Sequence, residues 1–107
     1  IRDARADLFF GESEVLVPAR ALLGMPGVSL APGHRVHYHH LLLPEHAILD
    51  CAGLPAESFL PNAYGLSLLS ESARASLEAT MPPEARAHYR PARPILRNFE
   101  AQTLRAA

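Results

Sequence analysis

Glycine and proline divide the first two thirds of this chain into short apolar runs. The 107 residues include 10 prolines and 6 glycines. Turn signals stand at Gly11–Glu14, Met25–Gly27 and Ala31–Gly33. Short apolar runs separated by frequent turns are typical of an all-β domain. The spacing of these residues therefore predicts a mainly β fold over residues 8–66.

Four of the apolar runs are predicted to be strands: Val15–Val17, Val28–Leu30, Arg35–Leu43 and His46–Ala52. The third is the longest, and Pro44 with Glu45 forms a turn after it, so we expect the last two to pair as a hairpin. Alternation along the third strand places Val36, Tyr38, His40 and Leu42 on one face and His37, His39, Leu41 and Leu43 on the other.

Helical patterns are expected in three places. Ala19–Leu23 fits one helical turn that ends at Gly24. Ser70 is a good N-cap for a helix from Glu71 to about Thr80. Glu100–Leu104 fits a short helix near the end. We accordingly divide the chain into a β part, residues 1–66, and a helix with a basic, proline-containing tail, residues 67–107.

Charge and composition exclude several classes of function. The net charge is −1 and no basic patch suited to nucleic acid is present. No stretch has the length of a membrane-spanning helix. The only cysteine, Cys51, excludes an internal disulfide framework. The arginines of the tail are expected to be solvated, because Glu84 and Glu100 interrupt them; they are Arg86, Arg90, Arg93, Arg97 and Arg105.

A cluster of histidines invites a metal-binding interpretation. It contains His34, His37, His39, His40 and His46. Imidazole is a common zinc ligand, but no cysteine or carboxylate stands at a usual ligand spacing. We therefore predict no metal and no cofactor, and keep a small histidine metal-binding β domain as an alternative. As acid–base groups, His46 and His40 are the best candidates.

Three segments resemble the C-terminal two thirds of a bacterial hedgehog/intein (Hint) domain. They are LFFGESEVLVPARAL at residues 8–22, VHYHHLLLPEHAILDCAGLPAESFLP at residues 36–61 and RPILRNFE at residues 93–100. The resemblance implies a Hint-like fold of short strands and hairpins, incomplete at its N-terminus, with a C-terminal helix. The chain begins with Ile1 rather than methionine, so we expect it to be part of a longer protein.

The resemblance also implies a chemistry. In this family an opening Cys or Ser attacks the preceding carbonyl in an acyl shift, assisted by a histidine in a Thr/Ser-x-x-His segment. Neither feature is found in this chain, and both are expected upstream of Ile1. Ala56–Phe59 stands where an intein has its terminal His-Asn, and no asparagine stands there. Protein splicing is therefore not expected.

Three residues are candidate site residues by the same resemblance. His40 aligns with the start of the strand that leads into the hairpin, His46 with a histidine or aspartate position near the site, and Ser58 with a family-like motif residue. We expect supporting roles for all three, and for Ser58 a structural role such as capping a turn. Cys51, within an apolar run, is expected to be buried and inert.

The predicted function is self-processing within a longer protein, with this chain catalytically incomplete alone. One alternative is an inactive Hint-like module with a structural or interaction role. The expected partner is the missing N-terminal segment of the same domain, or a second copy of the chain, because truncation exposes strand edges and apolar surface. We expect neither nucleic acid nor a membrane as a partner.

Overall fold

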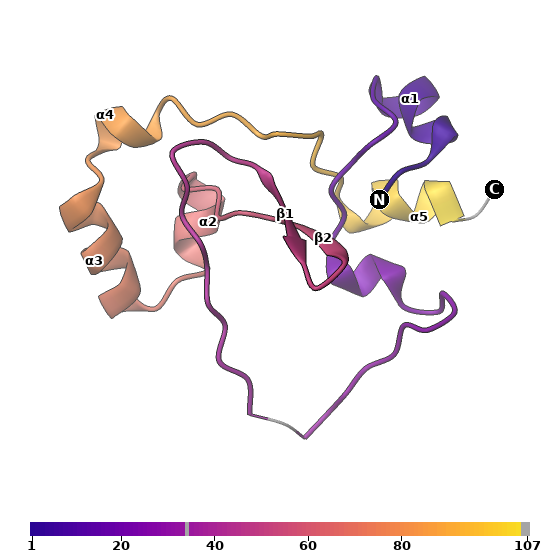
Figure 1. The fold of residues 1–107 in the computed structure, drawn as a ribbon, viewed down its shortest axis with the longest axis horizontal. Helices are drawn as coiled ribbons and strands as arrows, with labels where there is room; N and C mark the ends of the chain where they lie inside the picture. Colours follow the sequence, from indigo (N-terminus) through magenta and orange to yellow (C-terminus); the bar gives the residue numbers. More distant parts are fainter. Residues whose placement is uncertain (34, 106–107) are drawn as a thin grey trace. The chain divides into compact units, whose positions relative to one another are not determined.

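The computed structural model describes residues 1–33 and 35–105 and consists mainly of short helices joined by extended segments (Figure 1). The elements in chain order are α1 (Ala4–Phe10), the 3₁₀ helix η1 (Ala19–Leu22), β1 (Ile48–Cys51), β2 (Leu54–Glu57), α2 (Ala63–Ser67), α3 (Glu71–Thr80), α4 (Pro83–Arg86) and α5 (Asn98–Arg105). They belong to two compact units. Unit 1 combines Ile1–His39 with the chain from Arg93 onward, and unit 2 comprises His40–Ala92.

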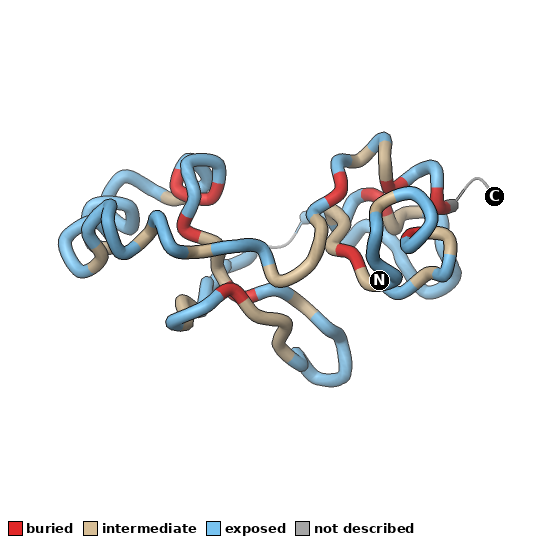
Figure 2. The backbone as a smooth tube through the Cα atoms, turned by 90° about the horizontal axis from the view of Figure 1, so that it is seen from above, coloured by how far each residue is buried: buried red, intermediate tan, exposed pale blue. Residues whose placement is uncertain are grey.

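Unit 1 contains the larger group of buried apolar side chains. Leu16 forms a parallel bridge with Ile95, in which Leu16 N donates to Pro94 O and Leu96 N donates to Leu16 O, each at 2.8 Å. This bridge joins the beginning of the chain to its end. The core around it contains Ala6, Val15, Ala21, Leu96, Ala101 and Leu104, with Phe10 and Val17 packed against it, and appears as red stretches in Figure 2.

Helix α1 was not predicted, although both of its ends carry recognisable signals. Asp3 is the N-cap, and its Oδ1 accepts a hydrogen bond from Arg5 N at 2.8 Å. Gly11 ends the helix with a φ of +85°, a conformation that glycine adopts without steric cost. The sequence interpretation placed a turn at Gly11 but overlooked the cap that begins the helix before it.

Unit 2 is organised around a two-stranded antiparallel hairpin. Strands β1 and β2 pair with Ile48 opposite Glu57 and Cys51 opposite Leu54. The two-residue turn has positive φ at both central positions, +55° at Ala52 and +87° at Gly53, as type I′ turns require. Asp50 Oδ1 also accepts a hydrogen bond from Gly53 N at 2.6 Å. The hairpin therefore turns at Ala52–Gly53 and not at Pro44–Glu45.

The prediction of a mainly β fold is wrong for the part of the chain that the structure describes. In residues 1–33 and 35–105, β1 and β2 are the only paired strands, and the remaining regular elements are helices. Residues 28–30 and 35–43 form no strand, and residues 15–17 contribute only the isolated bridge at Leu16. A strand needs a neighbouring edge for its backbone groups, and alternation along residues 35–43 separates no apolar face from a polar one.

The helical predictions fared better. Helix α3 spans Glu71–Thr80 as expected, and Ser70 Oγ accepts from Ala73 N at 3.2 Å. Helix η1 and helix α5 also lie where helical turns were expected. Over the described residues, no helix is long and apolar enough to cross a membrane.

Candidate functional site

His46 is the most enclosed ionisable residue of unit 2. It lies two positions before β1, and its side chain is 0% exposed. Its Nδ1 is 2.8 Å from Ala92 N, and its Nε2 is 2.7 Å from Oε2 of Glu57. Both ring nitrogens are thus engaged by groups of the same unit.

These two partners determine the tautomer of the His46 ring. A backbone N–H can only donate, so Nδ1 must be the acceptor for Ala92 and carries no proton. The ring proton of the neutral imidazole is then on Nε2, which donates to the Glu57 carboxylate. A second proton on Nδ1 would face the Ala92 N–H and remove that hydrogen bond. The geometry therefore favours a neutral imidazole that orients Glu57, rather than an ion pair.

Glu57 is brought to His46 by the register of the hairpin. Ile48 lies opposite Glu57, and His46 precedes Ile48 by two positions, so all three side chains share one face of the ladder. The Glu57 side chain is 49% exposed. Among the described residues its Oε2 is bonded by His46, whereas its Oε1 makes no hydrogen bond. The sequence interpretation missed this residue, because it placed the turn of the hairpin at Pro44–Glu45.

Ser58 closes the base of the hairpin from within. Only 1% of the residue is exposed. Its Oγ accepts a hydrogen bond from Ala47 N at 2.9 Å, and its own N donates to Ala47 O at 2.8 Å. The hydroxyl is therefore occupied by the backbone immediately after His46, which fixes the strand segment that carries the imidazole.

His40 lies apart from this network. It is exposed, and its ring is 5.3 Å from the ring of Phe59, centroid to centroid, at an angle of 50°. Phe59 N donates to the carbonyl oxygen of Leu41 at 2.8 Å, which keeps the His40 segment beside the end of the hairpin. Within the described part of the chain, no hydrogen bond joins His40 to His46, Glu57 or Ser58.

The stretch of chain before Arg93 completes the site, a contribution that no sequence signal suggested. Ala92 N donates to the His46 ring, and the hydroxyl of Tyr89 donates to the carbonyl oxygen of Leu43. Both bonds join positions 46 residues apart in the sequence. The tail segment, residues 86–92, therefore fixes the chain on both sides of Pro44–Glu45.

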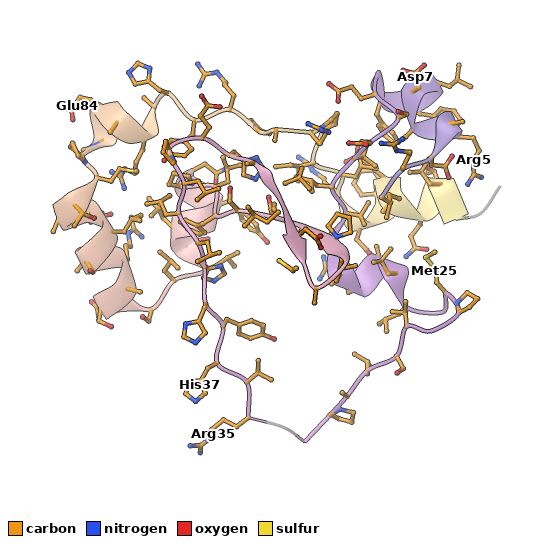
Figure 3. All side chains as sticks on the ribbon, viewed as in Figure 1. Arg5, Asp7, Met25, Arg35, His37 and Glu84 are labelled. Atoms are coloured by element: carbon orange, nitrogen blue, oxygen red, sulfur yellow. The ribbon has the colours of Figure 1, made fainter. Side chains whose placement is uncertain are left out.

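The other predicted groups do not assemble into a site. Among the described residues, no three His, Cys, Asp or Glu side chains lie so that they could hold a metal ion. His37 and His39 are exposed, and Figure 3 shows His37 on the extended stretch after residue 34. His34 lies outside the described residues. Cys51 is exposed, so the prediction of a buried cysteine is wrong.

Comparison with known proteins gives one match. A family model described as Hint domain matches residues 1–63 of the chain. No curated protein and no solved structure matches it.

Proposed function

The chain belongs to the Hint domain family, and from this premise we propose that it is part of a self-processing domain of a longer protein. The proposed reaction is an intramolecular acyl shift that ends in peptide cleavage or transfer. The nucleophile, a Cys or Ser heading the domain, is expected in the parent protein before Ile1. The chain alone is then catalytically incomplete.

The role of this chain in the proposed reaction is to supply a rigid hairpin against the reacting amide. The observation that carries this proposal is the enclosed His46 ring, held by Ala92 N at 2.8 Å and by Glu57 Oε2 at 2.7 Å. Groups that act in catalysis must be held in place before the reaction begins. Ser58 supports the same hairpin through Ala47, and His40 borders it beside Phe59.

The proposed partner of the chain is the opening segment of its own domain. Several large apolar side chains are well exposed, among them Leu8 at 80%, Leu30 at 76% and Val36 at 57%. Apolar side chains exposed in this number favour burial against another chain segment. A second copy of the chain is the alternative occupant, and sedimentation of the isolated chain distinguishes them, since self-association raises its mass with concentration.

One observation favours an inactive module as a second candidate. The Ser58 hydroxyl is enclosed and bonded to Ala47 N, so the Glu57–Ser58 pair has a structural explanation that needs no chemistry. A module that has lost activity retains such a hairpin and presents its exposed apolar residues to a partner.

The intact mass of the whole parent protein, followed over time with and without an added thiol, tests the proposed function. We expect two fragments whose masses sum to that of the precursor, appearing faster with thiol where the nucleophile is cysteine. Replacing that nucleophile with alanine is the matched control and abolishes cleavage. An unchanged mass under both conditions contradicts self-processing and favours the inactive module.

A further inference from the structure

We propose that Glu57 is the proton-transfer group of the processing reaction and that His46 is the positioning residue that orients it. This inference rests on the self-processing function proposed above and assigns a role that neither residue type nor spacing had indicated. It concerns a carboxylate with one oxygen held and the other open.

His46 itself is badly placed for proton exchange with a substrate. Its side chain is 0% exposed, and both ring nitrogens are hydrogen-bonded within unit 2. A general acid or base must come within hydrogen-bond reach of the proton that it transfers. Neither nitrogen of His46 can do so without breaking a bond to Ala92 or Glu57.

Glu57 has the opposite character. Half of its side chain is exposed, at 49%, and Oε1 makes no hydrogen bond within the described residues. Oε2 is held at 2.7 Å by His46 Nε2, while the opposite ring nitrogen is held by the backbone of Ala92. A backbone amide thus orients an imidazole, and the imidazole orients a carboxylate whose second oxygen faces outward.

The arrangement reduces the freedom of a side chain that otherwise samples many rotamers. Glu57 ends strand β2, so its backbone is fixed by the ladder. Its neighbour Ser58 is fixed by Ala47. Orientation of this kind contributes to catalysis because small displacements of a reacting group slow a reaction strongly.

In the proposed step the side-chain oxygen or sulfur of the heading Ser or Cys forms a bond to the preceding carbonyl carbon. Its proton passes to Oε1 of Glu57, which becomes a carboxylic acid. The carbon–nitrogen bond of the amide then breaks, and Glu57 returns the proton to the departing nitrogen. The amide has become an ester or thioester plus an amine, and the carboxylate is regenerated with no net gain or loss of protons.

The test uses the whole parent protein and follows cleavage by intact mass. Glu57→Gln keeps an acceptor for His46 Nε2–H but removes the carboxylate, and we expect cleavage to slow about 100-fold or more. Glu45→Gln is the matched control, because Glu45 is exposed, adjoins His46 and makes no printed ion pair in the described residues; its rate stays that of the parent. Cleavage by Glu57→Gln at the parent rate overturns the inference and leaves self-processing intact, whereas a parent that does not cleave overturns both.

A second pair of measurements separates positioning from folding. His46→Gln is expected to slow cleavage roughly 10- to 100-fold through misplacement of the carboxylate, yet to keep a rate that falls at acid pH as Glu57 is protonated. Glu57→Gln loses that acid limb. Added acetate restores cleavage to Glu57→Ala and does not restore it to His46→Gln. An acid limb that persists in Glu57→Gln, or an absence of rescue by acetate, overturns the assignment.

Discussion

Ser58 and Ala47 exchange two hydrogen bonds across the base of the hairpin, one from Ala47 N to Ser58 Oγ at 2.9 Å and one from Ser58 N to Ala47 O at 2.8 Å. The pair extends the β1–β2 ladder beyond Ile48 and Glu57. It lies directly between the residues that carry the imidazole and the carboxylate. The geometry of the candidate site therefore depends on a serine that does not itself reach solvent.

Replacing Ser58 with alanine should lower the free energy of unfolding by about 1–3 kcal/mol, because the Ala47 N–H loses its acceptor in an enclosed setting. A denaturant titration of the purified chain measures this change. Ser76→Ala on the exposed surface of helix α3 is the control and should stay within about 0.5 kcal/mol of the parent. Equal stability of Ser58→Ala and the parent would contradict the structural role of the hydroxyl.

Acidification should weaken unit 1 through Glu14. Hydrogen bonds from the side chains of Arg93 and then Arg2 hold the pKa of Glu14 below its usual value of 4.5. A lowered pKa in the folded state stabilises the fold above the unfolded pKa, and this contribution is lost as the pH falls through the folded pKa. Glu14→Gln should therefore flatten the decline in thermal midpoint below about pH 4.5. Glu12→Gln, at an exposed residue without a printed ion pair in the described chain, should leave that decline unchanged.

A side chain at Gly65 should destabilise unit 2. Gly65 is buried in helix α2, and a Cβ there would collide with the carbonyl oxygen of Leu60 and press on Asn62 Oδ1 at 3.2 Å. Backbone cannot move aside as a flexible side chain does, so Gly65→Ala should cost about 1–3 kcal/mol of unfolding free energy. Ala75→Ser, which adds one heavy atom to an exposed helical position, is the matched control. Comparable stability of the two variants would refute the predicted collision.

The turn of the hairpin offers a stabilising change. Ala52 has a φ of +55°, a left-handed conformation that costs alanine about 1–2 kcal/mol and that asparagine adopts more readily. Ala52→Asn also creates the Asn-Gly pair that type I′ turns prefer. We expect a gain of about 0.5–1 kcal/mol in unfolding free energy. Ala52→Val should change the stability in the opposite direction, because β-branched residues tolerate this conformation poorly; a gain for both variants would be inconsistent with the turn geometry.

The helices could be predicted where a local capping signal stands in the sequence. Ser70 is followed by a residue pattern that needs no distant partner, and α3 begins where that serine predicts. The strands could not be predicted in the same way, because a strand depends on an edge supplied by another part of the chain. Residues 35–43 have suitable side chains but no such edge, and they form no strand.

The same distinction applies to the candidate site. His46 was selected from the resemblance, and the structure encloses its ring, but its partners lie 11 and 46 positions away. The Glu57 partner would follow from period-two alternation once the turn is assigned to Ala52–Gly53. The Ala92 partner is a backbone amide, so no side-chain pattern identifies it.

The bridge between Leu16 and Ile95 has a consequence for the order of folding. Unit 1 is formed by two segments separated by the whole of unit 2, and its ion pair between Glu14 and Arg93 joins positions 79 residues apart. Contacts of such separation form late, because the entropy of closing the intervening loop must be overcome first. Unit 2 is contiguous, so during synthesis it emerges complete before the second segment of unit 1 exists. The hairpin with His46 and Glu57 is then in place before the beginning of the chain finds its partner.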